Sequence, residues 1–531
     1  MLKDNNVVKI SSKFPSFVFN IIGENCKTYR NEVQQIYELF SVYEYGAPFT
    51  PEGTSGDYVA SQIRFKKIKM LINKEARFMF SQTPEILINP LTNEDVEDEQ
   101  QKDACNNLNM VLNKVLENSD YSIKLLQGAK DCFVGKRIAV LVDYSNQDNQ
   151  GIQVHFYNSL QFYHEYKYGT KLLKRFVTFE CVYESDVLAE RRFLVNDYRT
   201  ENNVVYVTSN VYDGAGRVVE ELLNNVRTEL TEIPAVIIIN ESSLLDKNGI
   251  SDVESLIDLE SGYSKLSNSD IDSERKGMNP IRYTIDMAPN TTEKLPSGAG
   301  AYWDLQHDMN IDNPSPSVGT LSPSMSHTEP LKVTLERIET TMFQELEIPN
   351  ISQETMVGTI TSGKALKALY YPLMVRCDEK FIVWISAMKK VVKHIINFVL
   401  SNVNEIEGLY EVVGIVPVSY NIVINKRYAL LDDETEEKEI DISEVMNNIM
   451  SRKSYMKKHR KDLLTDGQIE QELQQIAIEA NMLDALTNPQ LRTNIEEEEV
   501  DQQVDQNIEQ EEIEMQETEP QETDSGDVND I

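Results

Sequence analysis

The chain has 531 residues, a length that suggests roughly three domains, and its hydrophobic content of 40% is ordinary for a protein with a packed core. No apolar run approaches the roughly 20 residues of a membrane span, and the N-terminus lacks the apolar segment of a signal peptide. The five cysteines show no CxxC spacing, and the six histidines form no HxxxH or HExxH pair. We therefore expect reduced thiols, no metal centre, no cofactor and no membrane association.

The net charge of −36 is spread over the whole chain. Sixteen acidic residues lie between Glu496 and Asp530, and without them the remainder still carries −20. Contacts of Lys and Arg with phosphate supply most of the non-specific affinity of proteins for nucleic acid. A chain this acidic is expected to hold DNA weakly if it meets DNA at all.

The first 250 residues begin with helices and continue as a sheet. Apolar residues at helical spacing predict helices near 31–40, over 55–80 and around 108–116. The basic face of the 55–80 helix is either solvated or contacts DNA or another subunit. From Arg137 onward the apolar period changes to two, which predicts antiparallel strands at 138–142, 152–156, 176–183, 204–207 and 233–240. The lack of strand–helix–strand alternation disfavours a dinucleotide-binding fold.

Two helices of similar length are expected to flank a compact insert. The first runs over 251–274 and opens with a capping box of Ser251 and Glu254. The second runs over 328–348, with Thr328 as its N-cap and a proline just after its end. The insert between them is rich in Gly, Pro, Ser and Asn and contains a strand at 280–287. This pattern predicts an antiparallel helix pair with a cap at its far end.

The last third of the chain combines a loop, a very long helix and a helical C-terminal part. Asn350 to Thr359 show no sustained period, and one helix is expected from Ser362 through Leu400, interrupted only at Pro372. The elements expected after it are strands at 412–416 and 420–424, an acidic surface segment at 432–441, helices at 442–450 and 470–486, a basic cluster at 452–461 and a disordered acidic tail beyond 493.

Residues 358–364 fit the pattern G-x-x-x-x-G-K of a phosphate-binding loop. In such loops a Ser or Thr after the lysine coordinates Mg²⁺, whereas this chain has Ala365. A helix and Pro349 also stand upstream, where the motif requires a buried strand. We therefore interpret the glycines as turn residues and Ser362-Gly363 as a helix start. The stretch 213–216 is likewise interpreted as a hairpin turn and not as a phosphate loop.

The order of strand, capped helix, insert, second helix, short loop and long helix resembles that of the portal proteins of tailed bacteriophages, in particular the SPP1-type portal family. The stretches Val253–Asp258 and Ser362–Leu366 look like that family's stem start and the helix after its tunnel loop. The resemblance covers roughly residues 50–490, and the order of elements carries it more than any single residue does. It implies an α+β portal fold with an α/β wing, a two-helix stem, a small α/β clip, a long kinked helix and a helical crown.

The resemblance also implies a division of the chain. The parts are a wing of helices and antiparallel sheet (1–250), stem helix 1 (251–274), clip (275–327), stem helix 2 (328–348), tunnel loop (349–361), long helix (362–404), wing return strands (405–441), crown (442–492) and a disordered acidic tail (493–531).

Candidate site residues follow from the same resemblance, and none of them is catalytic or metal-binding. The tunnel loop in the channel comprises Asn350, Ile351, Ser352, Gln353, Glu354, Thr355, Met356 and Val357. The stem residues that either line the channel or form ion pairs between helices are Lys265, Arg275, Lys332 and Arg337. The clip residues expected to dock partners are Arg282, Tyr283 and Trp303. The crown residues that either contact DNA or form a solvated helix face are Arg452, Lys453, Lys457, Lys458, Arg460 and Lys461.

The function implied is a channel for DNA packaging and ejection, built as a ring of twelve copies at one capsid vertex of the virion and assembled in the bacterial host cytoplasm. The implied partners are double-stranded DNA, held transiently and without sequence preference, the terminase large subunit, a head–tail adaptor, and the major capsid and scaffolding proteins. In this family ATP hydrolysis belongs to the terminase, so the chain is not expected to be an enzyme. Two alternatives stay open at this point: a P-loop-like packaging ATPase and a capsid scaffold or interaction protein without a channel.

Overall fold

The computed structural model divides the chain into two compact units, Met1–Leu430 (unit 1) and Leu431–Ile531 (unit 2), which are described separately. The residues that the structure describes are 15–23, 26–51, 59–91, 99–145, 151–185, 187, 190–241, 248–278, 281–288, 307–313, 315, 317–321, 326–351, 363–416, 418–428, 434–460 and 469–478.

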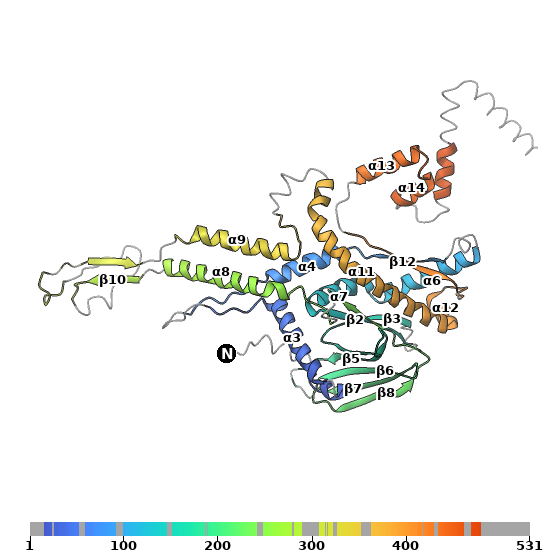
Figure 1. Cartoon of the computed structure of the whole chain (residues 1–531), viewed down its shortest axis with the longest axis horizontal. Coiled ribbons are helices and arrows are strands. Elements are labelled where there is room, and N and C mark those ends of the chain that lie inside the picture. The colour runs from blue at the N-terminus through green and yellow to red at the C-terminus, as the bar shows by residue number, and fades with distance from the viewer. Residues whose placement is uncertain are drawn as a thin grey trace, which may run out of the picture. The chain divides into compact units, whose positions relative to one another are not determined.

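Unit 1 mixes helices with antiparallel strands, which confirms the predicted α+β class (Figure 1). Its helices are α2 (Val18–Ile22), α3 (Cys26–Tyr45), α4 (Lys67–Phe80), α6 (Glu99–Asn118), α7 (Tyr121–Gly135), the 3-10 helix η3 (Glu254–Leu256), α8 (Ile257–Met278), α9 (Thr328–Glu345), α11 (Gly363–Ser401) and α12 (Val403–Tyr410). Its strands are β1 (Glu85–Pro90), β2 (Arg137–Ser145), β3 (Gly151–Asn158), β4 (Phe162–Tyr166), β5 (Leu173–Tyr183), β6 (Arg192–Glu201), β7 (Val204–Asp213), β8 (Val218–Arg227), β9 (Ala235–Ile239), β10 (Ile281–Ile285), β11 (Ser317–Leu321) and β12 (Tyr420–Asn425).

Two sheets form the strand-rich part of unit 1, one in the order β3-β2-β9 and one in the order β4-β5-β6-β7-β8. The five-stranded sheet is covered on one face by α2 and α3, through residues such as Phe17 and Phe193, and on the other face by the three-stranded sheet. Asn202 and Asn203, both at positive φ, form the two-residue turn between β6 and β7, a conformation that asparagine tolerates and that suits a tight hairpin. The predicted strands at 138–142, 152–156, 176–183, 204–207 and 233–240 are confirmed as parts of β2, β3, β5, β7 and β9.

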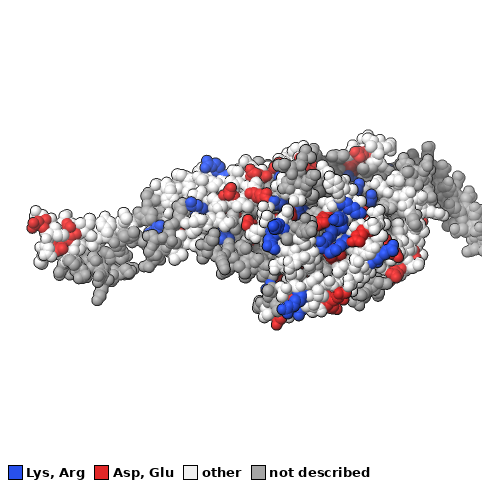
Figure 2. Space-filling view, turned by 60° about the horizontal axis from the view of Figure 1, so that its bottom comes forward, with Lys and Arg blue, Asp and Glu red and all other residues white. Residues whose placement is uncertain are grey.

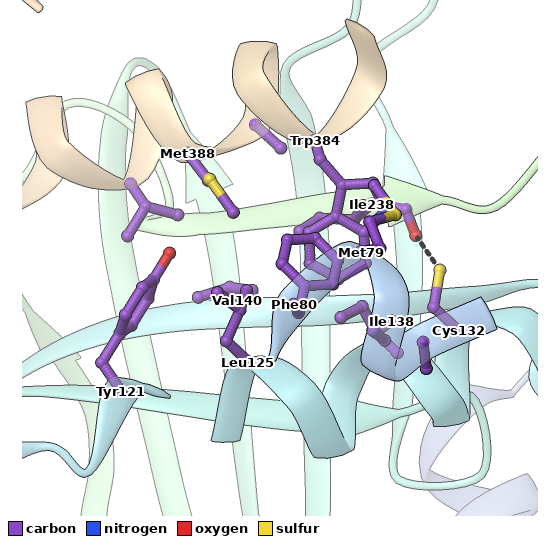
Figure 3. Packing of buried hydrophobic residues seen from close by; sticks show 14 of the residues in the cluster. Met79, Phe80, Tyr121, Leu125, Cys132, Ile138, Val140, Ile238, Trp384 and Met388 are labelled. Atoms are coloured by element: carbon purple, nitrogen blue, oxygen red, sulfur yellow. Dashed lines mark hydrogen bonds between the residues drawn. The ribbon is translucent and has the colours of Figure 1, made fainter. Parts of the chain in front are cut away.

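The main hydrophobic core lies between the long helix α11, the helices α4 and α7 and the three-stranded sheet. Figure 3 shows Trp384 and Met388 of α11 pointing toward Phe80 of α4 and toward the β2 residues Ile138 and Val140. Each of these five side chains is buried. The predicted long helix is confirmed, but the interruption predicted at Pro372 is wrong, because α11 runs unbroken from Gly363 to Ser401 with Pro372 inside it. α11 thus packs against β2, β9, β12, α4, α6 and α12 at the centre of this core.

The predicted helix over 55–80 is wrong over residues 59–66, because α4 begins only at Lys67, and 55–58 lie outside the described residues. Backbone N–H groups of Ser61, Ile63 and Phe65 instead donate to side chains of α8, and alternate residues can make such contacts only in an extended chain. The predicted strand at 412–416 is also wrong. Gly414 has a φ of +85°, and its N–H donates to the Glu407 carboxylate.

Both predicted helix caps differ from the observed ones. The Ser251 hydroxyl accepts from the Val253 N–H, and the Glu254 carboxylate pairs with the Lys136 ammonium, so the reciprocal capping box does not form. η3 forms the first turn, and α8 follows it. Thr328 is the first residue of α9 and His327 stands in the cap position, because the helix starts one residue earlier than predicted.

Unit 2 contains α13 (Glu434–Met446), α14 (Arg452–His459) and a helical stretch at 469–478. Asp441 of α13 is buried and pairs with Lys458 and His459 of α14, with N···O distances of 2.7 Å and 2.5 Å. The segment predicted as an acidic surface therefore lies largely within a helix, and its last residue holds that helix to the next one.

Candidate functional site

α8 and α9 lie side by side and carry a small hairpin at their far end (Figure 1). Near that end, His327 before α9 approaches Asp270 of α8 at 3.4 Å. At the other end, α9 contacts η3, and Met342 and Leu346 join the main core. The two helices are therefore antiparallel, as their lengths and the insert between them predict.

The hairpin consists of β10 and β11, of which the sequence predicted only β10. Tyr283 stands opposite Gly319, and a Cβ at Gly319 would lie 2.4 Å from the Tyr283 ring. Gly319 therefore leaves room for the Tyr283 ring to lie over it, and the same glycine interrupts the apolar alternation of β11 in the sequence. Tyr283 is 46% exposed, while the side chain of Arg282 and all of Trp303 lie outside the described residues.

A row of four polar side chains on α8, spaced by four residues, is buried against an extended segment. The Glu260 carboxylate accepts from the backbone N–H groups of Ala47 and Ile68 at 2.7 Å and 2.9 Å. One turn further along α8, Ser264 accepts from Phe65 at 3.4 Å. We call this row the stem ladder, and its residues are Glu260, Ser264, Asn268 and Asp272.

The remaining two residues of the stem ladder make the closest contacts with the extended segment. Asn268 accepts from the Ile63 N–H at 2.8 Å and donates to the Ile63 carbonyl at 2.7 Å. Asp272 accepts from the Ser61 N–H at 3.1 Å and from the Ser61 hydroxyl at 2.6 Å. Burial raises the pKa of Glu260, while the N–H groups of Ile68 and Ala47 oppose that rise. The ladder fixes both the rotation of α8 and its register along the chain.

Four charged residues meet where α8 begins, and we call them the root network: Glu75 on α4, Asp252 before η3, and Arg376 and Lys380 on α11. Arg376 contacts Glu75 at 3.0 Å and Asp252 at 2.8 Å. Lys380 contacts Glu75 at 2.7 Å and Asp252 at 2.6 Å, and its ammonium lies 3.9 Å from the centre of the Phe133 ring. Burial lowers the pKa of Lys380, but the carboxylates of Asp252 and Glu75 outweigh burial and raise the pKa overall. The sequence analysis did not identify this network.

The predicted stem charges lie on the outside of the helix pair. Lys265 and Arg275 of α8 and Lys332 and Arg337 of α9 are all exposed. Arg275 lies 3.5 Å from Asp272 on its own helix, and its guanidinium donates to the Ser61 hydroxyl. Arg275 thus extends the stem ladder through contacts with Asp272 of its own helix and with Ser61.

Most of the predicted tunnel loop lies outside the described residues. Asn350 is exposed and Ile351 half-buried after the end of α9, while 352–357 lie outside the described residues. The phosphate-loop pattern at 358–364 is described only from Gly363 onward, where α11 starts. Upstream of it, the described residues form α9 and a short irregular stretch, and no strand of the kind that the motif requires.

The basic cluster of unit 2 is largely paired with carboxylates of the same unit. Lys453 contacts Glu470 at 2.6 Å, Lys458 contacts Asp441, and Arg460 contacts Glu472 at 3.5 Å. Arg452 and Lys457 are exposed on α14, and Lys461 lies outside the described residues. These ion pairs neutralise part of the positive charge that the cluster could otherwise use to bind nucleic acid.

Two kinds of functional feature are missing from the part of the chain that the structure describes. It contains no group of His, Cys, Asp or Glu side chains arranged to hold a metal ion. None of its helices has both the length and the apolar character needed to cross a bilayer. On the face drawn in Figure 2, Lys and Arg form separate patches among Asp and Glu, and no continuous basic stripe is seen.

The arrangement defines a mixed α+β protein in which an antiparallel helix pair carries a hairpin, and a long helix organises the core. The family model described as "Phage portal protein, SPP1 Gp6-like" matches residues 29–484. The chain therefore belongs to the SPP1 Gp6-like family of phage portal proteins. It acts as a portal protein of a phage, and this family is structural and not enzymatic.

Comparison with solved structures gives low similarity. A chain from the neck of an empty gene transfer agent particle, computed with C6 symmetry, is 12% identical, covers 74% of this chain and 88% of its own, and gives a TM-score of 0.36. Chains from the virion of the native gene transfer agent particle and from its neck, computed with C12 symmetry, are 10% identical with the same coverage and give a TM-score of 0.33. Likeness at this level carries no conclusion about the fold. No curated protein matches the chain.

Proposed function

We propose that copies of this chain close into a ring of twelve that forms the DNA channel at one capsid vertex of the virion. The observation that carries the proposal is the antiparallel pair α8 and α9, held at its root by buried charges and along its length by the stem ladder. A helix pair anchored in this way is rigid enough to form one subunit's segment of a channel wall.

The parts of the chain take the roles that the family suggests. Residues 1–250 and 405–441 form the wing, 251–274 and 328–348 the stem, and 275–327 the clip, with 442–492 as the crown. The clip docks the terminase large subunit and later the head–tail adaptor, and the exposed ring of Tyr283 supports this role, because tyrosine is enriched at protein interfaces. The major capsid and scaffolding proteins contact the rest of the ring, which assembles in the cytoplasm of the bacterial host.

The charge of the chain supports a channel that holds DNA loosely. Each phosphate contact with Lys or Arg releases counterions and strengthens binding, which would slow a genome that has to slide. The net charge of −36 and the paired basic cluster of unit 2 keep such contacts few. The tunnel loop, Asn350 to Val357, is proposed as the narrowest point of the channel, and Lys265, Arg275, Lys332 and Arg337 as its positive positions.

Electron microscopy of the purified chain, combined with mass measurement, tests the proposal. Twelve copies of the 60.8 kDa chain give an assembly on the order of 700 kDa, and its end view should show a bore wide enough for duplex DNA. A protein that stays monomeric under every assembly condition, or assemblies without a bore, would contradict the proposal. ATP turnover by the pure chain that is lost in Lys364→Ala would instead favour a packaging ATPase.

A further inference from the structure

The tip of the β4–β5 hairpin is a basic segment in an acidic chain. From Tyr166 to Phe179 the sequence contains no acidic residue and four basic ones: Lys167, Lys171, Lys174 and Arg175. The whole chain, by contrast, has 87 acidic and 51 basic residues. Arg175 is committed to the fold, because its guanidinium pairs with Asp197 at 2.8 Å and donates to two carbonyls at the end of α2. The three lysines therefore carry the charge that the hairpin presents to solvent.

The positive charge of these lysines is only partly offset by their own contacts. The Lys167 ammonium donates to the uncharged side-chain oxygen of Asn203 at 3.4 Å. Lys174 approaches Glu165 only at 4.0 Å, and Lys171 forms no salt bridge with any residue that the structure describes. Long or neutral contacts of this kind leave the ammonium groups available to an anion.

The neighbouring residues do not cancel the charge of the tip either. Residues 162–175 lie beside the end of β6, 197–201. The basic residues of these two stretches are Lys167, Lys171, Lys174, Arg175 and Arg199, and the acidic ones are Glu165, Asp197 and Glu201. His164 is neutral, because burial lowers its pKa to about 3. The hairpin and its neighbour therefore hold an excess of two positive charges in a chain whose net charge is −36.

The tip is held in shape by its own backbone. The Lys167 N–H donates to the Leu172 carbonyl at 2.8 Å, and the Thr170 N–H donates to the Lys167 carbonyl at 3.0 Å. Gly169 has a φ of +71°, a conformation that glycine adopts without strain. Beside it, Tyr168 is fully exposed. A phenol hydroxyl and ammonium groups thus lie on one short turn that is already ordered before a partner binds.

We propose that this tip binds the phosphate backbone of duplex DNA at a site separate from the channel. Lys and Tyr side chains are among those that contact phosphate oxygens, and such contacts carry no sequence preference. Figure 1 shows β5 in the sheet-rich part of unit 1, away from the helix pair α8 and α9 that is proposed to line the channel. Contacts at the tip therefore do not slow the stretch of DNA that slides through the channel.

Duplex DNA is favoured over an acidic protein segment as the partner of the tip. DNA carries one negative charge per about 1.7 Å of its axis, so the three lysines of one short turn can each meet a phosphate at the same time. The proposed function also brings duplex DNA to the assembled chain, and the inference rests on the proposed function for this choice of partner.

Binding to closed-circular duplex DNA tests the proposal, because a closed circle cannot thread through the bore of a preformed ring. Filter binding compares the wild type with Lys167→Ala/Lys171→Ala/Lys174→Ala over a series of NaCl concentrations. At about 50 mM NaCl the variant should bind at least tenfold more weakly. The slope of log K against log salt should fall by at least about 2.7, since each lost phosphate contact removes about 0.9. Tyr168→Phe, which lacks only the hydroxyl, should bind about two- to threefold more weakly.

Two controls separate this site from a general effect of charge. Lys102→Ala/Lys390→Ala/Lys393→Ala removes the same charge from exposed positions on α6 and α11, and it should bind DNA as the wild type does. Poly-glutamate stands in for an acidic protein segment, and at equal charge concentration it should compete at least about tenfold less well than unlabelled duplex DNA.

The outcomes judge the inference and the proposed function separately. The inference is wrong if the wild type does not bind the circular DNA, if the hairpin variant binds as well as the wild type, if the control variant is weakened equally, or if poly-glutamate competes equally. Rings in negative-stain images that show any of these results leave the proposed function standing. Binding that depends on the three lysines in a protein that forms no ring would support the inference and overturn the proposed function.

Discussion

The root network and the stem ladder both bury polar side chains around α8, but they satisfy them in different ways. In the root network two carboxylates and two cations from three separate elements neutralise one another. In the stem ladder the partners are uncharged: backbone groups of Ala47, Ile63, Phe65 and Ile68, and the N–H and hydroxyl groups of Ser61. Each ladder residue makes its own contact. The first arrangement holds elements together at one point, whereas the second holds a helix along its length.

This difference predicts different responses to the loss of one side chain. Every member of the root network depends on the others, because a buried charge that loses its partner remains in a medium that disfavours it. A residue of the stem ladder leaves only one or two backbone groups unpaired when it is removed. Removing any one residue of the root network should therefore destabilise the whole network, whereas each residue of the stem ladder should contribute its own separate share of stability.

The largest effect is expected from Lys380→Met. The substitution keeps the length of the side chain but leaves Glu75 and Asp252 with only Arg376 to offset their charge, so the free energy of unfolding should fall by about 3–5 kcal/mol. Urea denaturation followed by circular dichroism measures the change.

The control for this prediction is Lys390→Met, at an exposed position on the same helix. It should change the free energy of unfolding by less than about 0.5 kcal/mol. Equal effects of the two substitutions would show that the root network contributes nothing specific to stability.

A smaller effect is expected from Glu260→Ala in the stem ladder. It removes the acceptor for the Ala47 and Ile68 N–H groups, and we expect a loss of about 2–4 kcal/mol in the free energy of unfolding. Hydrogen exchange should show faster exchange at these two amides while the root amides keep their protection.

Ser264→Ala provides the graded comparison within the same ladder. It removes a single contact of 3.4 Å to the Phe65 N–H, so its effect should stay below about 1 kcal/mol. If Ser264→Ala destabilised the protein as much as Glu260→Ala does, the ladder would act as a unit and the contrast with the root network would fail.

The third prediction concerns a half-buried carboxyl, that of Asp131, which accepts a hydrogen bond from the amide of Asn158. Burial raises the pKa of Asp131 to about 6 against an ordinary value of 3.8, while the hydrogen bond from Asn158 opposes the rise. Because the folded pKa is raised, the contribution of Asp131 to stability is present below pH 4 and is lost as the pH rises through 6. Asp131→Asn should therefore become more stable than the wild type by roughly 1–3 kcal/mol above pH 6.

Thermal or urea unfolding of both proteins at several pH values from 4 to 8 checks this prediction. The two curves should run close together at pH 4 and separate by pH 7. Parallel curves over the whole range would mean that Asp131 ionises as easily in the folded protein as in the unfolded one.

Regular elements with a clear period could be predicted from the sequence. The strands near 138–142 and 176–183 are marked by apolar and β-branched residues, and the long helix from Gly363 follows its apolar spacing through Pro372. The order of elements around residues 251–366 was enough to indicate the portal family, which the family match confirms.

The stem ladder could not be predicted, because a polar stripe on a helix normally faces water. Glu260, Ser264, Asn268 and Asp272 do repeat every four residues, but their partners lie about 200 residues earlier in the chain. The root network is hidden for the same reason, since each of its charges looks like a surface residue in its own stretch of sequence. The tunnel loop from Ser352 onward, Trp303 and Lys461 stay predictions, because they lie outside the described residues.

The pairing of β1 with β12 has a consequence for how the protein folds during its synthesis on the ribosome. Glu85 pairs with Asn425 and Pro90 with Tyr420, so strand partners that are more than 300 residues apart must meet. Contacts of such long sequence separation form late, so α6 can pack on β1 early, whereas the strand edge of β1 stays unpaired until translation has passed β12. An unpaired strand edge is a site for unwanted pairing, and the nascent chain carries this one through most of its synthesis.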